Sequence, residues 1–194
     1  VLLYHVERMN EESANALLKV MEEPPEGVLF LLTADSLASV LPTIRSRCVS
    51  FAVAPVSPEQ CARYCVAQGV DKKTAALYSE LFDGHIGTVL AAARDEARTA
   101  QVEKALQLAK AAAAHDSYAA AVLLAAFEKD KAGAAALLAD FRAVAAAGLR
   151  GSPHAPVQGA DAQRALRLAE AAIQRLGAQV NPKIVLSVFA AKLA

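Results

Sequence analysis

Residues 15–48 decide the fold of this chain, and they read NALLKVMEEPPEGVLFLLTADSLASVLPTIRSRC. The stretch predicts a helix first, because apolar residues recur at the i, i+3, i+4 and i+7 spacing of one helix face. These residues are Ala14, Leu17, Leu18 and Met21. Asn10 is placed to cap this helix, and Pro24–Pro25 forbids its continuation. The stretch therefore begins with a helix that the two prolines terminate.

Short apolar runs lie before and after this helix. They are Val1–Tyr4, Val28–Leu32 and Val49–Val53. Val28–Leu32 is nearly unbroken, which suits a strand covered on both faces, as in a parallel sheet. Strands alternating with helices predict the α/β class, with right-handed crossovers between parallel strands.

Two arginines, Arg45 and Arg47, stand just before the third apolar run. In a parallel α/β sheet such a loop lies at a sheet edge, where ligands are commonly bound. The plainer alternative is a pair of solvated arginines, since arginine is usually exposed. Both side chains would project alike from an extended segment, so position does not choose between them.

The segments ERMN, NALLKVMEEPP and LPTIRSRC, in this order and at this separation, resemble the AAA+ clamp-loader subunits of bacterial DNA polymerase III. The resemblance is sharp over Val1–Phe51 and looser behind it. It implies an α/β part followed by an all-α part. These would be a partial AAA+ parallel-sheet core over 1–54, a three-helix lid over 55–98 and a helical collar for oligomerisation over 99–194.

Within that family the chain looks most similar to the delta-prime type, because groups needed for ATP hydrolysis are replaced. Tyr4 and His5 stand where ATPase members carry the acids that hold Mg²⁺ and orient water. Thr88 stands where they carry an arginine that reaches the γ-phosphate. No GxxxxGK[ST] motif occurs in these residues, and Val1 resembles the middle of an AAA+ core, which would have its P-loop upstream.

The resemblance implies a subunit without ATPase activity of its own, within the DNA-directed DNA polymerase holoenzyme. Its Ser46-Arg47-Cys48 triplet matches the family motif whose arginine faces ATP and Mg²⁺ on a neighbouring subunit. Its partners would be gamma/tau-type and delta subunits, with the sliding clamp and primer-template DNA reached through the assembled complex. Two alternatives stay open: an ATP-hydrolysing gamma/tau-type subunit, and an AAA+-like scaffold without a replication role.

The composition limits other functions. Lys and Arg number 20 and Asp and Glu number 20, so no strong basic field predicts autonomous DNA binding. We expect no transmembrane helix and no signal peptide, because no long uncharged apolar run occurs and charges follow Val1–Leu3 at once. Three cysteines without framework spacing fit the reducing cytoplasm.

Cys61 and Cys65 lie four residues apart, and two thiols at that spacing could bind a metal. A structural zinc site needs four ligands, and the sequence offers no second pair. We therefore expect core or half-buried thiols, and neither a metal nor a cofactor in this chain.

The remaining residues predict short helices and then long, alanine-rich ones. Ser57 opens a helix with a capping box, Asp71 caps a second helix that ends at Asp83–Gly84, and a third runs over Ile86–Arg98. Further helices are expected at 99–114, 117–129, 131–148, 160–177 and 182–193. The loop over 151–159 is expected to be long and mobile. The expected core residues are Leu123, Phe127, Leu137, Leu138, Phe141, Leu166, Ile173, Leu176, Ile184, Val188 and Phe189.

Overall fold

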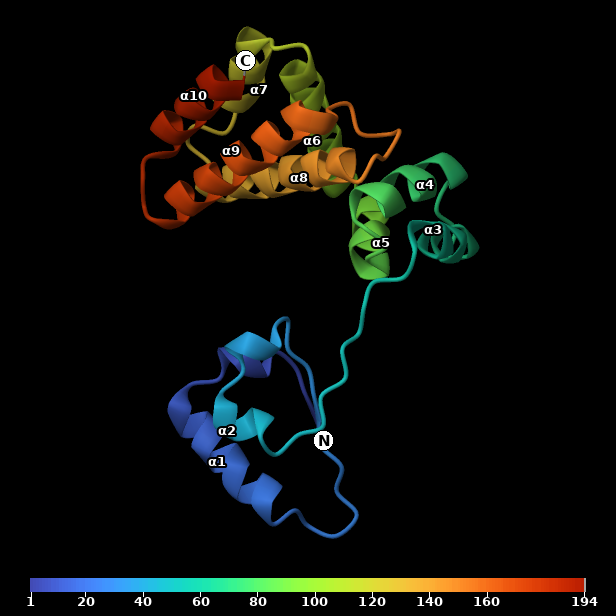
Figure 1. Cartoon of the computed structure of the whole chain (residues 1–194), viewed down its shortest axis with the longest axis vertical. Coiled ribbons are helices and arrows are strands. Elements are labelled where there is room, and N and C mark those ends of the chain that lie inside the picture. The colour runs from blue at the N-terminus through green and yellow to red at the C-terminus, as the bar shows by residue number, and fades with distance from the viewer. Residues whose placement is uncertain (194) are drawn as a thin grey trace. The chain divides into compact units, whose positions relative to one another are not determined.

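The computed structural model describes residues 1–193, which fall into two compact units that divide between Ala54 and Pro55. Unit 1 holds two short parallel strands and two α-helices, and unit 2 is entirely helical in its described part (Figure 1). The predicted order, an α/β part followed by an all-α part, is therefore found, although helix dominates the described residues. This arrangement is consistent with a partial AAA+ clamp-loader fold.

In unit 1, strand β1 (Leu2–Leu3) pairs in parallel with β2 (Leu31–Leu32). Between them lie a 3₁₀ turn at Val6–Arg8 and helix α1 (Glu11–Glu22). The predicted cap is confirmed, because the Asn10 side chain accepts a hydrogen bond from the Ser13 N–H at 2.8 Å.

A second 3₁₀ turn (Leu37–Ser39) and a short helix, α2 (Pro42–Arg45), follow β2. The strand predicted at Val49–Val53 is wrong, because this run pairs with no strand of the described chain. Its apolar side chains are exposed, with Phe51 at 85% and Val53 at 93%. Apolar, β-prone residues form a strand only where a neighbour supplies backbone partners and a surface to pack on. The expected cover on both faces is also absent from the described residues, since Leu31 is 56% exposed.

A small core joins the two helices of unit 1. Val6, Ala14, Val40 and Ile44 are buried, and the predicted apolar face of α1 packs against them. Ala14 on α1 and Ile44 on α2 are each only 1% exposed. The core therefore fixes α2, and the turn that follows it, relative to α1.

Unit 2 begins with three short helices, α3 (Pro58–Ala67), α4 (Lys72–Leu81) and α5 (Ile86–Arg94). The capping box of Ser57 with Gln60 and the cap by Asp71 form as predicted. The third helix ends four residues before its predicted end at Arg98. The reason is Asp95, whose carboxylate accepts from the Ala97 N–H at 2.9 Å and starts the next helix.

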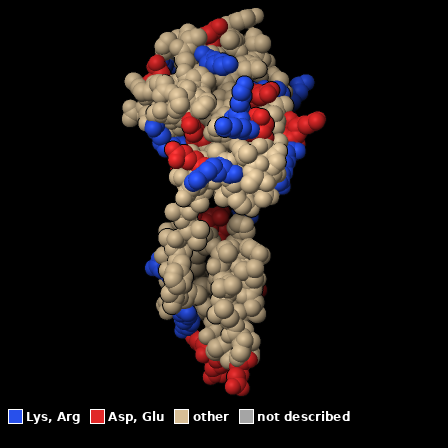
Figure 2. All heavy atoms as spheres, turned by 90° about the vertical axis from the view of Figure 1, so that its right-hand side faces the viewer, with Lys and Arg blue, Asp and Glu red and all other residues tan. Residues whose placement is uncertain are grey.

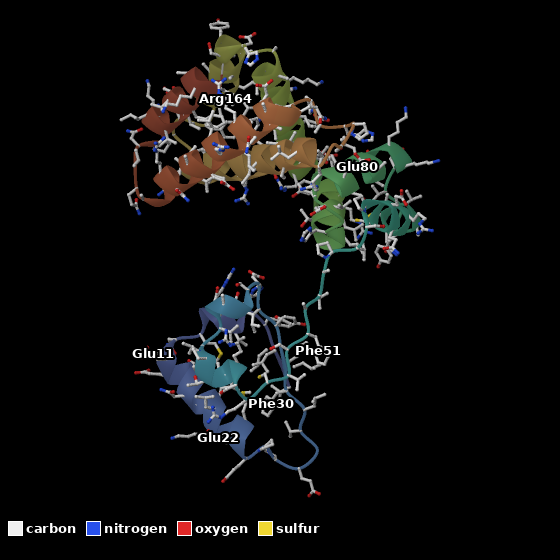
Figure 3. The ribbon with its side chains drawn as sticks, viewed as in Figure 1. Glu11, Glu22, Phe30, Phe51, Glu80 and Arg164 are labelled. Atoms are coloured by element: carbon white, nitrogen blue, oxygen red, sulfur yellow. The ribbon has the colours of Figure 1, made fainter. Side chains whose placement is uncertain are left out.

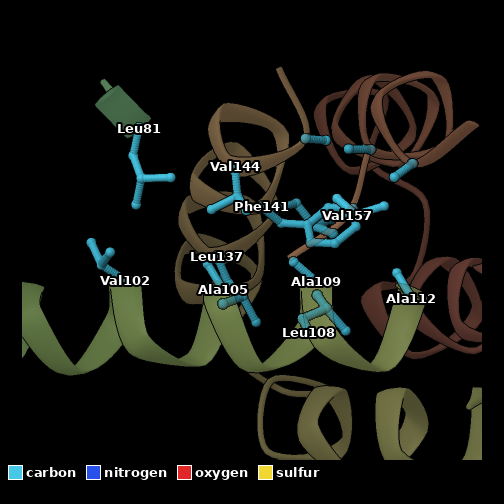
Figure 4. Packing of buried hydrophobic residues seen from close by; sticks show 14 of the residues in the cluster. Leu81, Val102, Ala105, Leu108, Ala109, Ala112, Leu137, Phe141, Val144 and Val157 are labelled. Atoms are coloured by element: carbon cyan, nitrogen blue, oxygen red, sulfur yellow. The ribbon is translucent and has the colours of Figure 1, made fainter. Parts of the chain in front are cut away.

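Five further helices complete the described part of unit 2: α6 (Glu96–Ala113), α7 (Ser117–Ala125), α8 (Lys131–Leu149), α9 (Gly159–Gly177) and α10 (Pro182–Leu193). Their core is continuous with that of α3–α5, and Figure 4 shows the side chains of α6 and α8 meeting in it. Phe141 on α8 contacts Phe189 on α10 edge to face, with ring centroids 5.5 Å apart. Two predicted core residues are wrong, because Ile184 and Val188 are 59% and 38% exposed on the outer side of α10.

The loop between α8 and α9 packs against the core of unit 2. Val157 is fully buried, and the side-chain amide of Gln158 donates to the carbonyls of Ser152 and Ala155 at 2.7 and 2.9 Å. Two prolines in a sequence do not by themselves reveal that a loop folds back onto a core.

By length and composition alone, one helix in the described chain, α8, could cross a membrane. Half of that stretch is buried inside the structure, and the core helix of a water-soluble domain passes the same test. Its burial against α6 and α9 explains its apolar character without a membrane.

Candidate functional site at the end of helix α2

The turn that carries the two arginines is helical. Pro42 occupies the first turn of α2, where its missing N–H costs nothing. After α2 the chain continues to turn, because the Arg47 N–H donates to the Ile44 carbonyl at 3.1 Å and the Cys48 N–H to the Arg45 carbonyl at 3.3 Å. The expectation of an extended segment is therefore wrong. Residues two apart on a helix point about 200° from each other, so Arg45 and Arg47 project differently.

Arg47 is held by three contacts. Its Nη1 donates to the Thr43 carbonyl at 3.0 Å and to the Ser46 hydroxyl at 3.3 Å, while Nη2 is paired with the Glu22 carboxylate. The side chain of Arg47 nevertheless remains 38% exposed. Arg45 is exposed, and its side chain has no hydrogen-bond partner among the described residues. The structure thus separates two arginines that the sequence treats alike.

The two motif neighbours of Arg47 have different places. The Ser46 hydroxyl accepts from Arg47 and itself donates to the Thr43 carbonyl at 3.0 Å. Cys48 is half-buried and packs against the small core of unit 1. Ser46 therefore supports the guanidinium directly, whereas Cys48 anchors the turn to the core.

A second cluster lies at the ends of the two strands. The Nδ1 of His5 lies 3.2 Å from a Glu7 carboxylate oxygen and 3.7 Å from one of Asp35. Sequence reasoning missed Asp35, although the carboxyl ends of paired parallel strands meet at one edge of a sheet. The Glu7 pKa is lowered, chiefly because the carboxylate accepts a hydrogen bond from its own backbone. Burial acts in the opposite direction, and the contact with His5 lowers the pKa further.

The ligand atoms of His5, Glu7 and Asp35 all lie within 4.8 Å of one another, as a small cation site would need. The same contacts also form without a metal, because an imidazole beside two carboxylates is a common arrangement of side chains in proteins. Tyr4 is 68% exposed beside them. Neither a tyrosine nor an imidazole at these positions supplies the carboxylate pair that holds Mg²⁺ in ATPases.

The other residues singled out from the sequence lie in unit 2. Thr88 is exposed in the first turn of α5. Cys61 and Cys65 are fully buried, which confirms the prediction of core thiols. Burial, with Cys61 beside it, raises the pKa of Cys65 to about 11, which favours the neutral thiol.

Comparison with known proteins agrees with the motifs around this site. Residues 1–57 match the family described as DNA polymerase III, delta subunit. DNA polymerase III subunit delta' of Haemophilus influenzae is 56% identical over 48 residues, which is 25% of this chain and 15% of that protein. The subunit delta' of Pseudomonas aeruginosa is 37% identical over 94 residues, 48% of this chain and 28% of that protein.

The match also extends to a neighbouring class. DNA polymerase III subunit tau of Escherichia coli is 42% identical over 59 residues, 30% of this chain and 9% of that protein. The chain thus spans less than a third of the length of each of these relatives. The resemblance predicted from the motifs is confirmed: the matching residues are similar to those of DNA polymerase III subunits.

Proposed function

We propose that this chain is a delta-prime-like AAA+ subunit of the DNA polymerase III clamp loader. It completes the ring of subunits and presents Arg47 as an arginine finger to ATP and Mg²⁺ on a gamma/tau-type neighbour. That ATP-driven assembly, with a delta subunit, loads the sliding clamp on primer-template DNA. The observation that carries the proposal is the side chain of Arg47 in the Ser46-Arg47-Cys48 triplet: Thr43, Ser46 and Glu22 hold it, and it is still 38% exposed.

The guanidinium of Arg47 has unused N–H groups that could donate hydrogen bonds to a phosphate. A guanidinium offers five N–H groups, and the three contacts within the chain use three of them. During transfer the γ-phosphoryl group spreads negative charge over its equatorial oxygens, and a planar guanidinium can meet two of them at once. Lysine offers only a single point charge, so it would be a poor substitute.

We also propose that the chain hydrolyses no ATP itself and acts in the cytoplasm as part of the polymerase holoenzyme. Tyr4 and His5 lack the chemistry of an acid pair, and Thr88 is too short and uncharged to act as a sensor arginine. On the face of unit 2 that Figure 2 shows, Lys and Arg side chains are interspersed with Asp and Glu, and the whole sequence carries 20 residues of each sign. Contact with DNA would therefore depend on the other subunits.

In the proposed assembly α3–α5 serve as the lid and α6–α10 as the collar that joins the subunits. Support comes from exposed apolar residues on α7 and α10, two helices that pack against each other. Tyr118 on α7 is 79% exposed and Ile184 on α10 is 59% exposed. Large apolar side chains that face solvent on neighbouring helices are typical of a surface that another protein covers.

The test is a clamp loader reconstituted with this subunit. Arg47→Ala should lower clamp- and DNA-stimulated ATP hydrolysis at least about tenfold without loss of assembly, since arginine fingers in GTPases contribute on the order of 10³–10⁵ in rate and slower steps here mask part of it. Arg47→Lys should rescue little, and Arg45→Ala is the matched control that should leave hydrolysis unchanged.

Two outcomes would favour the other functions. ATP turnover by the purified subunit alone, abolished by a change at His5, would indicate a gamma/tau-type ATPase. Failure to assemble with any clamp-loader subunit would indicate a scaffold without a replication role.

A further inference from the structure

Glu22, the last residue of α1, is the acidic partner of Arg47. The two residues are separated by 25 positions in the chain and are brought together by the packing of α1 on α2. Figure 3 labels Glu22 at the end of α1. The sequence motifs alone assign it no role beyond the end of a helix.

Glu22 is poorly suited to the helix that carries it. A carboxylate in the last turn faces the negative end of the helix dipole, which is unfavourable for the helix. Residues that break a local rule of this kind often serve a site. The stability of α1 therefore gives no reason for an acidic residue at this position, whereas the contact with Arg47 does.

The contacts of Arg47 come from both helices. Thr43 and Ser46 hold Nη1 from the side of α2, and Glu22 holds Nη2 from the side of α1. A free arginine side chain samples many rotamers, so ordering it costs conformational entropy. Contacts on both terminal nitrogens therefore restrict the orientation of the guanidinium relative to the packed α1–α2 pair.

We propose that Glu22 is a positioning residue for Arg47, an inference that rests on the finger role proposed above. Glu22 orients the guanidinium before the neighbour's nucleotide arrives, so that less of this ordering remains to be done in the transition state. The Glu22 side chain is 50% exposed, so water screens its charge and the arginine remains attractive to phosphate.

The neighbouring residue supplies a matched control. Glu23 carries the same charge one position further on, is exposed, and its side chain has no hydrogen-bond partner among residues 1–193. Any effect of bulk charge near the end of α1 should follow from either residue. An effect of orienting Arg47 should follow from Glu22 alone.

The experiment compares Glu22→Ala, Glu22→Gln, Glu23→Ala and Arg47→Ala in the reconstituted loader. Glu22→Ala should lower the kcat of clamp- and DNA-stimulated ATP hydrolysis about two- to fivefold, the range expected for an exposed ion pair, with an unchanged KM for ATP. Glu22→Gln should keep most of the activity, because an amide oxygen can accept the same hydrogen bond. Glu23→Ala should match the unaltered subunit, and adding Glu22→Ala to Arg47→Ala should cost nothing more.

The outcomes separate this inference from the proposed function. If Arg47→Ala slows hydrolysis while Glu22→Ala does not, the positioning role is wrong and the finger stands. Faster hydrolysis in Glu22→Ala would mean that Glu22 restrains the finger, which also overturns the inference. Equal losses of hydrolysis rate in Glu22→Ala and Glu23→Ala would show a general effect of charge, and this would overturn the positioning role. Unchanged hydrolysis in Arg47→Ala would refute the proposed function and this inference together.

Discussion

Replacement of Arg98 by alanine should destabilise unit 2 far more than the loss of an ordinary surface arginine. Asp140 lies inside α8 with 4% of its surface exposed. Both of its carboxylate oxygens are paired with the guanidinium of Arg98, and Gln101 donates to one of them at 2.8 Å. The paired carboxylate in turn raises the Arg98 pKa, because it hydrogen-bonds to the charged guanidinium. Arg98→Ala would leave a buried carboxylate whose one remaining side-chain donor among the described residues is Gln101.

The size of the effect follows from two estimates. Breaking a buried ion pair by removing one partner costs about 3–5 kcal/mol. The Arg98 side chain is 29% exposed, so in the variant water can partly solvate the Asp140 carboxylate. We therefore expect a loss of about 2–4 kcal/mol in unfolding free energy. Protonation sets a ceiling of about 4 kcal/mol at pH 7, the free energy of neutralising an ordinary aspartate at that pH.

The assay is urea unfolding of the chain followed by circular dichroism, which reports mainly on the helices of unit 2. Arg98→Ala should lose about 2–4 kcal/mol of unfolding free energy at pH 7, and less at pH 5, where protonation of a carboxylate is easier by about 1.4 kcal/mol per pH unit. Adding Asp140→Asn should restore part of the loss, because it removes the buried charge. Arg142→Ala, at an exposed position of α8 without a partner among the described residues, is the control. A loss equal to that of Arg142→Ala and independent of pH would refute this reasoning.

Two further predictions concern the packing of α8 and its loop. Gly148→Ala would place a Cβ 1.9 Å from the Val157 carbonyl oxygen, so it should lower the unfolding free energy by about 1–3 kcal/mol in the same assay; an unchanged value would show that the loop can move aside. The Glu80 pKa is lowered: burial raises it, but hydrogen bonds from Ser152 and His154 outweigh burial. A carboxylate with a lowered pKa stabilises the fold above the ordinary pKa of glutamate, and this stability is lost as the pH falls through the lowered pKa. Glu80→Gln should therefore make the unfolding free energy decline less steeply below about pH 4.5. A decline identical to that of the unaltered chain would contradict the assignment.

Features that depend on neighbouring residues were predictable from the sequence. The caps by Asn10, Ser57 and Asp71 formed as expected, because each cap is a contact with backbone three or fewer residues away. The family motifs were equally readable, since they lie within a single stretch of the chain. Asp95 is the exception, because it followed an apparently continuous helical pattern.

Features that depend on distant partners were not predictable. The Arg98–Asp140 pair spans 42 positions and the Arg47–Glu22 pair 25, so neither leaves a local pattern. The apolar run around Phe51 satisfied the local rule for a strand but found no partner in the described chain. Ile184 was predicted in the core because it is apolar, although its neighbour Val185 faces inward instead.

The central claim, that Arg47 acts on ATP held by a neighbouring subunit, is tested most directly by the rate of ATP hydrolysis in one measurement. A loader containing Arg47→Ala is compared with one containing Arg45→Ala, both assembled to the same extent and saturated with sliding clamp and primed DNA. The account predicts at least about a tenfold slower rate for Arg47→Ala and an unchanged rate for Arg45→Ala. Equal rates for the two variants and the unaltered loader would contradict it.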